Sequence, residues 1–176
     1  NFEEAPIMPC VWPTGCGPVI EVPMGDHPLY AGSFQVHLGR IRLYLLDSNV
    51  EGNSPADRQL SARLYTADRE QRIQQEILLG IGGVRLLRSL GVEPSVWHAN
   101  EGHTAFMMLE RVREQVARGV TFPDALRSVQ ANTVFTTHTP VPAGNDVFPF
   151  DLVERYFRPY WESLGIDRDT FMRLGS

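Results

Sequence analysis

The sequence predicts an α/β fold with parallel strands, and three observations support this. Over residues 95–164, short apolar or β-branched runs alternate with longer amphipathic runs in the order strand, helix, strand, helix. The longer runs repeat apolar residues at helical spacing. Hydrophobic residues make up 43% of the chain and charged residues 21%, which is typical of a globular protein and not of a disordered one.

The first 55 residues contain two regions. Residues 1–18 are rich in proline and glycine and are expected to be a loop. Residues 19–55 show the pattern of a β meander, with a polar loop at its end. Turns are expected at residues 23–26 and 39–40, and strands at Val19–Val22, Phe34–Leu38 and Ile41–Asp47.

Residues 56–176 form the α/β part, which opens with a long helix. Asp68 is the expected N-cap and Gly91 the expected C-cap. The apolar residues Ile73, Ile77, Ile81 and Val84 repeat at helical spacing, so we expect them to face the core. The glycines at positions 80, 82 and 83 lie inside this helix, and not between a strand and a helix as in a dinucleotide fingerprint. We interpret them as a point where another backbone approaches closely.

The remaining elements alternate in type. Pro94 and Ser95 lead into a short strand, and a capping box of Thr121 with Asp124 opens the second of three further helices. Asp167 is expected to start one more helix, after these three. In chain order we expect a strand at Val96–His98, a helix at His103–Arg118, a helix from Thr121, a strand at Asn132–Thr137, a loop at Pro140–Phe148 and a helix at Asp151–Leu164.

Two histidine-containing loops follow the two predicted strands. The first covers residues 98–103 and the second residues 137–140. In open parallel sheets, ligands bind at the carboxyl ends of the strands. A carboxylate there accepts hydrogen bonds from sugar hydroxyls, and a neutral imidazole donates or accepts one. We therefore expect His103 and His138 to approach one shared crevice.

Other interpretations of these loops stay open from the residues alone. Asn100 could cap the following helix, with Glu101 favouring the helix dipole, and His138 could be a core histidine with a satisfied ring. A metal site built from His98, Glu101, His103 and His138 is a rival, but their spacing differs from the i, i+4 pairing of metal-binding helices. We therefore expect no metal. A nucleophile elbow of the G-x-S-x-G type does not occur in the sequence.

Charge and hydropathy exclude several classes of protein. The net charge of −5 argues against nucleic-acid binding, which needs a concentrated basic face. Apolar runs fall short of the roughly 20 residues that a membrane helix requires. The first residues show no signal-peptide pattern, so a cytoplasmic location is expected. All 16 basic residues are arginine, so the chain itself offers no lysine for Schiff-base chemistry.

Five segments together resemble the glycogen, starch and maltodextrin phosphorylases, especially the shorter bacterial type. They span roughly residues 19–164 and are more specific in combination than any single motif. The segments are Val36–Asp47, Arg58–Tyr65, Glu70–Arg85, Trp97–Phe106 and Phe135–Phe148.

The resemblance implies a fold, a reaction and a set of site residues. It implies part of the N-terminal Rossmann-like domain of a two-domain GT-B glycosyltransferase fold. It also implies transfer of a glucosyl unit from an α-1,4-glucan to phosphate, giving α-glucose 1-phosphate with pyridoxal phosphate as cofactor. By the same resemblance, Asn100, Glu101 and His103 bind the glucosyl unit, and His138 binds it and takes part in catalysis. Some relatives carry Asp-Thr-His where this chain has Glu101, Gly102 and His103.

The chain also departs from the phosphorylase pattern. The glycine-rich phosphate loop is missing, as is the second domain with the lysine that holds the cofactor, so residues 1–176 are expected to be a partial N-terminal domain. Two alternatives to a phosphorylase fragment follow. The chain could be a catalytically silent carbohydrate-binding remnant, or an interaction module that kept the fold and lost the chemistry.

Overall fold

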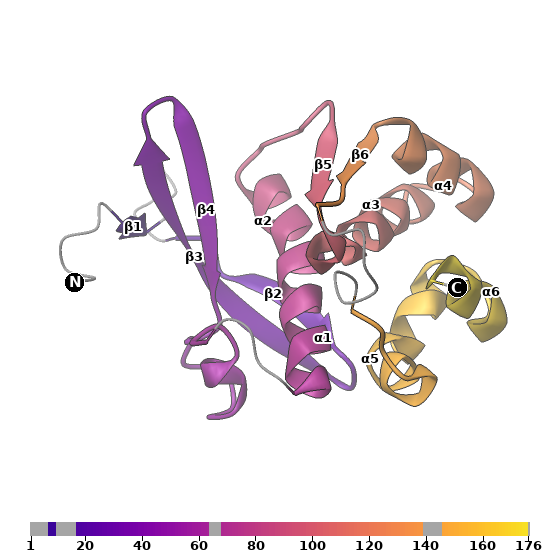
Figure 1. Cartoon of the computed structure of the whole chain (residues 1–176), viewed down its shortest axis with the longest axis horizontal. Coiled ribbons are helices and arrows are strands. Elements are labelled where there is room, and N and C mark those ends of the chain that lie inside the picture. The colour runs from indigo at the N-terminus through magenta and orange to yellow at the C-terminus, as the bar shows by residue number, and fades with distance from the viewer. Residues whose placement is uncertain (1–6, 10–16, 64–67, 139–145, 176) are drawn as a thin grey trace.

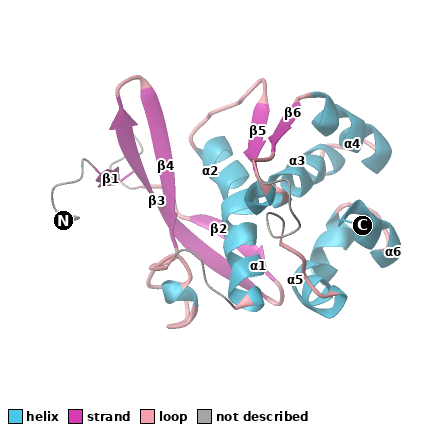
Figure 2. Cartoon of the chain, in the orientation of Figure 1, coloured by secondary structure: helices cyan, strands magenta, loops and turns pink. Residues whose placement is uncertain are grey.

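Two sheets and a set of helices make up the computed structural model, which describes residues 7–9, 17–63, 68–138 and 146–175. An antiparallel sheet occupies one side of the molecule and a parallel strand pair the other, with a helical rod between them (Figure 1). In Figure 2, α3 and α4 lie below and to the right of the parallel pair, and α5 and α6 lie lower still, with α5 contacting α1 through Tyr156 and Glu70. Among the described helices, none is long and apolar enough to cross a membrane.

The antiparallel sheet is built around its longest strand, β3. Strand β3 (His27–Leu38) pairs with β2 (Ile20–Met24), β4 (Ile41–Asp47) and the short β1 (Ile7–Pro9). Alternate residues of β2 are buried, as expected for a strand with one face on the core. The predicted β meander is confirmed, with turns at residues 25–26 and 39–40.

Two predictions for this region were wrong. Pro23 and Met24 belong to β2 and not to a turn, because β2 is an edge strand and an edge tolerates a residue without an N–H group. β1 lies within the predicted loop 1–18, and its pairing with β3 is a long-range contact that the local pattern did not indicate. The other residues of that loop described here, 17–18, are in no regular element.

A continuous helical rod connects the two sheets. It consists of α1 (Arg69–Ile77), a π-helical turn (Leu78–Gly82) and α2 (Gly83–Ser89). The predicted N-cap is confirmed, since Asp68 accepts from the backbone N–H of Glu70 at 2.9 Å. The C-cap is Leu90, and Gly91 follows it with the left-handed φ of +69° that ends the helix. The four apolar residues predicted to face the core are at most 1% exposed: Ile73, Ile77, Ile81 and Val84.

Gly80 marks the point where this rod touches α3. A Cβ atom added at Gly80 would lie 2.8 Å from the backbone nitrogen of Met107 and 3.0 Å from the carbonyl carbon of Phe106. The predicted close approach of another backbone is therefore confirmed at this position. It fixes the separation between the rod and the segment that carries the first histidine loop.

The parallel pair consists of β5 (Trp97–Asn100) and β6 (Thr133–Thr136), joined by α3 (Phe106–Val116) and α4 (Phe122–Ala131). The predicted parallel pairing is confirmed. β5 extends two residues beyond the predicted strand, so Asn100 is its last residue. The helix expected from His103 begins as a 3-10 turn at Gly102–Thr104 and becomes α-helical at Phe106. Thr121 and Asp124 form the predicted cap, with Thr121 accepting from the N–H of Asp124.

The C-terminal helices α5 (Phe150–Ser163) and α6 (Arg168–Met172) pack through an aromatic cluster, and a 3-10 turn, Arg173–Gly175, follows them. Phe157 lies at the centre of this cluster, 1% exposed, with ring centroids of Phe106, Tyr160 and Phe171 at 4.7, 5.8 and 5.3 Å. These contacts join α5 and α6 to the start of α3. Asp167 caps α6 as predicted. Of the predicted loop Pro140–Phe148, residues 140–145 lie outside the described residues.

A fully buried carboxylate ties three helices together. Glu110 on α3 accepts hydrogen bonds from Arg85 on α2 at 2.9 Å, from Arg113 at 2.7 Å and from the hydroxyl of Tyr160 on α5 at 2.5 Å. Burial by itself would raise the pKa of Glu110, but the hydrogen bonds from Arg113 and Arg85 outweigh it and lower the pKa. The carboxylate is therefore charged and paired inside the core.

Candidate functional site

The two histidine loops leave the parallel pair at the same edge. Residues Glu101 and Thr137 each come directly after a strand, β5 and β6 respectively. The backbone N–H of Glu101 donates to the carbonyl of Thr136 at 2.8 Å, which continues the ladder one step beyond the strands. The carboxyl end of the pair is therefore a single polar edge, as the sequence predicted.

Glu101 links the two loops through its carboxylate. One oxygen accepts from the Thr137 hydroxyl at 3.2 Å, and the other accepts from the backbone N–H of His138. The side chain is largely buried, with 9% of Glu101 exposed. Its backbone has φ 61° and ψ −176°, a combination that is essentially confined to glycine and costs about 1–3 kcal/mol. The surrounding hydrogen bonds hold this conformation, which directs the carboxylate toward β6.

Asn100 holds the ring of His138. The Oδ1 atom of Asn100 lies 2.9 Å from Nε2 of His138, and because an amide oxygen only accepts, Nε2 is the donor. Two alternative interpretations were wrong. Asn100 does not cap the following turn, since its oxygen bonds to His138 and the turn has no side-chain cap. His138 is not a core histidine, since it is exposed.

His103 lies in the 3-10 turn after Glu101 and faces the first helix of the rod. Nη2 of Arg72 is 2.8 Å from Nδ1 of His103, and Nε of Arg72 is 2.9 Å from Oδ2 of Asp146. One carboxylate oxygen of Glu76 lies 3.4 Å from Nε of Arg72 and 3.7 Å from Nδ1 of His103. We call Arg72, Glu76, His103 and Asp146 the His103 cluster.

Sequence reasoning missed three members of the His103 cluster: Arg72, Glu76 and Asp146. One signal could have indicated Glu76, since it falls three residues after Ile73 and one before Ile77, on the side of the helix predicted to be buried. A carboxylate on a buried face needs a partner. Arg72 is four residues earlier on the same helix, so it lies within reach of Glu76. Asp146, however, is 74 residues from Arg72.

The two carboxyl groups of the His103 cluster differ in charge. Burial, helped by the neighbouring carboxyl group of Asp146, outweighs the effect of Arg72 and raises the pKa of Glu76 to about 8. For Asp146, burial acts to raise the pKa, but hydrogen bonds with Glu76 and Arg72 outweigh it and lower the pKa. At neutral pH Glu76 is therefore mainly protonated and Asp146 is charged opposite Arg72.

The metal-site alternative finds no support at the four predicted residues. Among the described residues, those whose ligand atoms come within 4.8 Å of one another are Glu76, His103 and Asp146. Arg72 donates to two of these three residues, so a guanidinium already supplies positive charge between them. His98 bonds to the Thr136 hydroxyl at 2.5 Å instead of joining His103.

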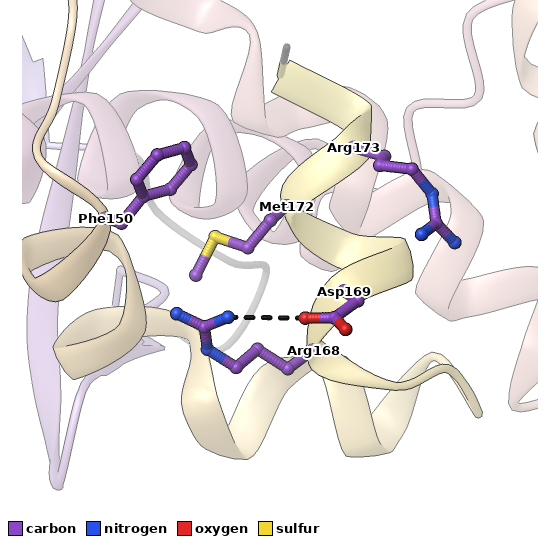
Figure 3. Close-up of a pocket in the computed structure, with 5 residues that line it drawn as sticks. All are labelled: Phe150, Arg168, Asp169, Met172 and Arg173. Atoms are coloured by element: carbon purple, nitrogen blue, oxygen red, sulfur yellow. Dashed lines mark hydrogen bonds and ion pairs between the residues drawn. The ribbon is translucent and has the colours of Figure 1, made fainter.

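Two hollows lie away from these loops. A shallow one of about 330 Å³ is lined by α5, α6 and the turn after α6 (Figure 3), where Arg168 contacts Asp169 at 3.3 Å. A second, of about 170 Å³, lies at the opposite end of the parallel pair, beside Trp97 at the start of β5. Neither is lined by Asn100, Glu101, His103 or His138, so a crevice shared by His103 and His138 stays a prediction.

Comparison with known proteins gives a consistent result. The chain is 49% identical over 175 residues to maltodextrin phosphorylase of Thermococcus litoralis, covering 99% of this chain and 21% of that protein. It is 49% identical over 145 residues to glycogen phosphorylase of Mycobacterium tuberculosis, covering 78% of this chain and 17% of that protein. It is 37% identical over 151 residues to glycogen phosphorylase of Aquifex aeolicus, covering 86% of this chain and 22% of that protein. No protein-family model matches the chain.

The match to the Thermococcus litoralis protein extends over nearly all residues of the chain, so it includes the segments in which the sequence resembles the phosphorylases. The chain spans about a fifth of the length of the curated relatives it matches. By sequence, it is a relative of the maltodextrin and glycogen phosphorylases and corresponds to one part of those glycosyltransferases.

Proposed function

We propose that this chain provides one wall of the glucosyl-binding site of an α-glucan phosphorylase. The reaction is transfer of a glucosyl unit from an α-1,4-glucan to phosphate, which gives α-glucose 1-phosphate. The observation that carries the proposal is the carboxyl edge of the parallel pair, where Glu101 joins the loops that carry His103 and His138. The identity to phosphorylases, 49% over 99% of the chain, supports the same reaction.

Each residue of this edge has a role in the proposal. His138, oriented by Asn100 through Nε2, presents its ring and the adjacent backbone to the glucosyl unit as a catalytic and binding residue. His103 and Asn100 hydrogen-bond sugar hydroxyls, and Glu101 acts mainly by holding the two loops in register. The fold in this proposal is part of an N-terminal Rossmann-like domain of a GT-B glycosyltransferase in the cytoplasm, and β5 and β6 are two of its parallel strands.

The cofactor of the proposed enzyme does not fit this chain alone. Pyridoxal phosphate attaches covalently through a lysine, and all 16 basic residues here are arginine. We therefore assign no cofactor-binding residue to the chain, and its own residues serve to bind and orient the sugar. Incubation with pyridoxal phosphate followed by borohydride reduction should leave no pyridoxyl group on any side chain, which peptide mass mapping would check.

A chimera tests the proposed function directly. The 175 aligned residues of the Thermococcus litoralis maltodextrin phosphorylase would be replaced by this chain, and phosphate-dependent release of glucose 1-phosphate from maltoheptaose would be measured. The chimera should be active. In it, His138→Ala should lower kcat/KM by about 10-fold or more, equivalent to about 1.4 kcal/mol of transition-state stabilisation, whereas His37→Ala, an exposed histidine on β3, should not.

An inactive chimera would support the alternative function, that of a catalytically silent carbohydrate-binding remnant. A chimera that folds, retains its cofactor and binds maltoheptaose but releases no glucose 1-phosphate would contradict the proposal. It would identify the chain as a carbohydrate-binding remnant without chemistry.

A further inference from the structure

His103 has two ring nitrogens, and its contacts decide which of them carries the proton. Arg72 projects from α1 and lies within the His103 cluster, with its side chain 15% exposed. Its Nη2 atom contacts Nδ1 of His103 at 2.8 Å, a normal hydrogen-bond distance. The two carboxyl groups near the same nitrogen, on Glu76 and Asp146, are both 3.7 Å away, beyond that distance.

Hydrogen-bonding capacity decides the direction of this contact. A guanidinium has five N–H donors, no acceptor, and is not deprotonated in proteins. The Nδ1 atom of His103 must therefore accept with its lone pair, which leaves the ring neutral with its proton on Nε2. An imidazolium, or the tautomer protonated on Nδ1, would set two N–H groups against each other.

We propose that Arg72 is a positioning residue that fixes His103 as the Nε2–H tautomer, so that His103 donates a hydrogen bond to an oxygen of the bound glucosyl unit. The part of this statement that concerns the sugar rests on the proposed function. The part that concerns the tautomer rests only on the contact between Arg72 and His103.

The charges of the His103 cluster agree with a neutral ring. Arg72 is positive and Asp146 negative, while burial keeps Glu76 mainly protonated at neutral pH. The cluster is then balanced without a proton on Nδ1 of His103. Without the guanidinium, Nδ1 would face only Asp146 and Glu76, whose carboxylates accept hydrogen bonds. A proton on Nδ1 would then become favourable, because it could be donated to one of them.

The packing of the rod holds Arg72 in place. Gly80, two turns further along the same rod, has no room for a Cβ beside the backbone of Met107 at the start of α3. The guanidinium of Arg72 also donates to Asp146 through Nε, so it is held at two positions, by Asp146 and by His103. Its distance to His103 is therefore set by backbone packing as well as by the side chains.

The tautomer is measured by NMR. Protein labelled with 15N in histidine would be studied by two-bond 1H–15N correlation at neutral pH, with His103→Gln used to assign the ring. We expect an unprotonated Nδ1 and a protonated Nε2 in the unaltered chain. The result in Arg72→Met should differ, with signal for a proton on Nδ1. The control Arg69→Met, at an exposed arginine three positions earlier in α1, should leave the pattern unchanged.

Several outcomes would overturn the proposal. An imidazolium or an Nδ1–H tautomer in the unaltered chain would overturn it. This result needs no variant, so it holds even when Arg72→Met fails to fold. An identical pattern in a folded Arg72→Met would also do so. Arg72→Lys, which keeps a donor at this position, should retain the original pattern, and circular dichroism would check the fold of each variant.

Activity in the chimera separates this proposal from the proposed function. Arg72→Met should lower kcat/KM by about 2- to 10-fold, the loss expected for one uncharged hydrogen bond, while Arg69→Met should not. An inactive chimera with the expected tautomer would contradict the proposed function alone. An active chimera with the opposite tautomer would contradict the role of Arg72 alone.

Discussion

The carboxylate of Glu101 accepts a hydrogen bond from the backbone N–H of His138, which ties the end of β5 to the loop after β6. The two residues are 37 positions apart in the sequence. Glu101 makes this contact from a backbone conformation that residues other than glycine rarely adopt, with φ 61° and ψ −176°. An unfavourable local conformation is therefore retained at the polar edge where the two histidine loops meet.

Glu101→Gly should be more stable than Glu101→Ala. Both variants remove the carboxylate, which leaves the His138 N–H without this acceptor at a cost of about 1–3 kcal/mol. Glycine also relieves the backbone conformation at position 101, worth about 1–3 kcal/mol, whereas alanine does not. Urea unfolding of both variants would measure the difference. An alanine variant as stable as the glycine variant would show that the backbone at this position is not strained.

Gly80→Ala should destabilise the chain by about 1–3 kcal/mol, because its Cβ would press on the backbone of Phe106 and Met107 and force the rod away from α3. Gly83→Ala is the matched control in the same rod, where a Cβ meets nothing within 4 Å. That variant should be neutral or stabilising by about 0.4–1 kcal/mol. Urea unfolding midpoints of the two variants would test the contrast, and equal midpoints would contradict it.

Glu76 should make stability fall as pH rises from its ordinary pKa of 4.5 to its folded-state pKa of about 8. Its pKa of about 8 in the folded state lies above its ordinary value of 4.5, so folding takes up a proton between these values. The free energy of unfolding should therefore decrease with rising pH across this window, by up to about 1.4 kcal/mol per pH unit. Arg72, His103 and Asp146 face the same carboxyl group, but the lowered pKa of Asp146 affects stability only in more acidic solution.

Glu76→Gln should remove most of this slope, because glutamine stays neutral at every pH. The exposed Glu162 on α5 offers a control, and Glu162→Gln should leave the slope as it is. Chemical denaturation at a series of pH values between 5 and 9 would measure it. If the slope in Glu76→Gln equals the slope in the unaltered chain, the pH dependence belongs to another group.

Glu110→Ala should cost about 3–5 kcal/mol, the range for breaking a buried ion pair on one side. Glu110 is 0% exposed, and its loss leaves Arg85, Arg113 and the hydroxyl of Tyr160 without their common acceptor. Glu154→Gln tests an exposed pair with Arg168 and should cost about 0–1 kcal/mol. Thermal or urea unfolding would compare them, and a Glu110 variant with near-normal stability would contradict the structural role of this carboxylate.

Features that depend on neighbouring residues were predictable from the sequence. The buried stripe from Ile73 to Val84 follows from helical spacing, and the caps at Asp68, Thr121 and Asp167 follow from hydrogen bonds within one turn. The parallel pairing of β5 and β6 follows from the order of elements, since two parallel strands need a crossover between them. The same reasoning placed both histidine loops at one edge.

Features that depend on contacts between distant segments were decided only by the tertiary structure. Nothing in the local sequence indicates that Arg72 reaches Asp146, or that Asn100 bonds to the His138 ring instead of capping a turn. The pairing of β1 with β3 and the burial of Glu110 are of the same kind. Local spacing determines which face a side chain occupies, whereas its hydrogen-bond partner depends on which segment packing brings within about 3 Å.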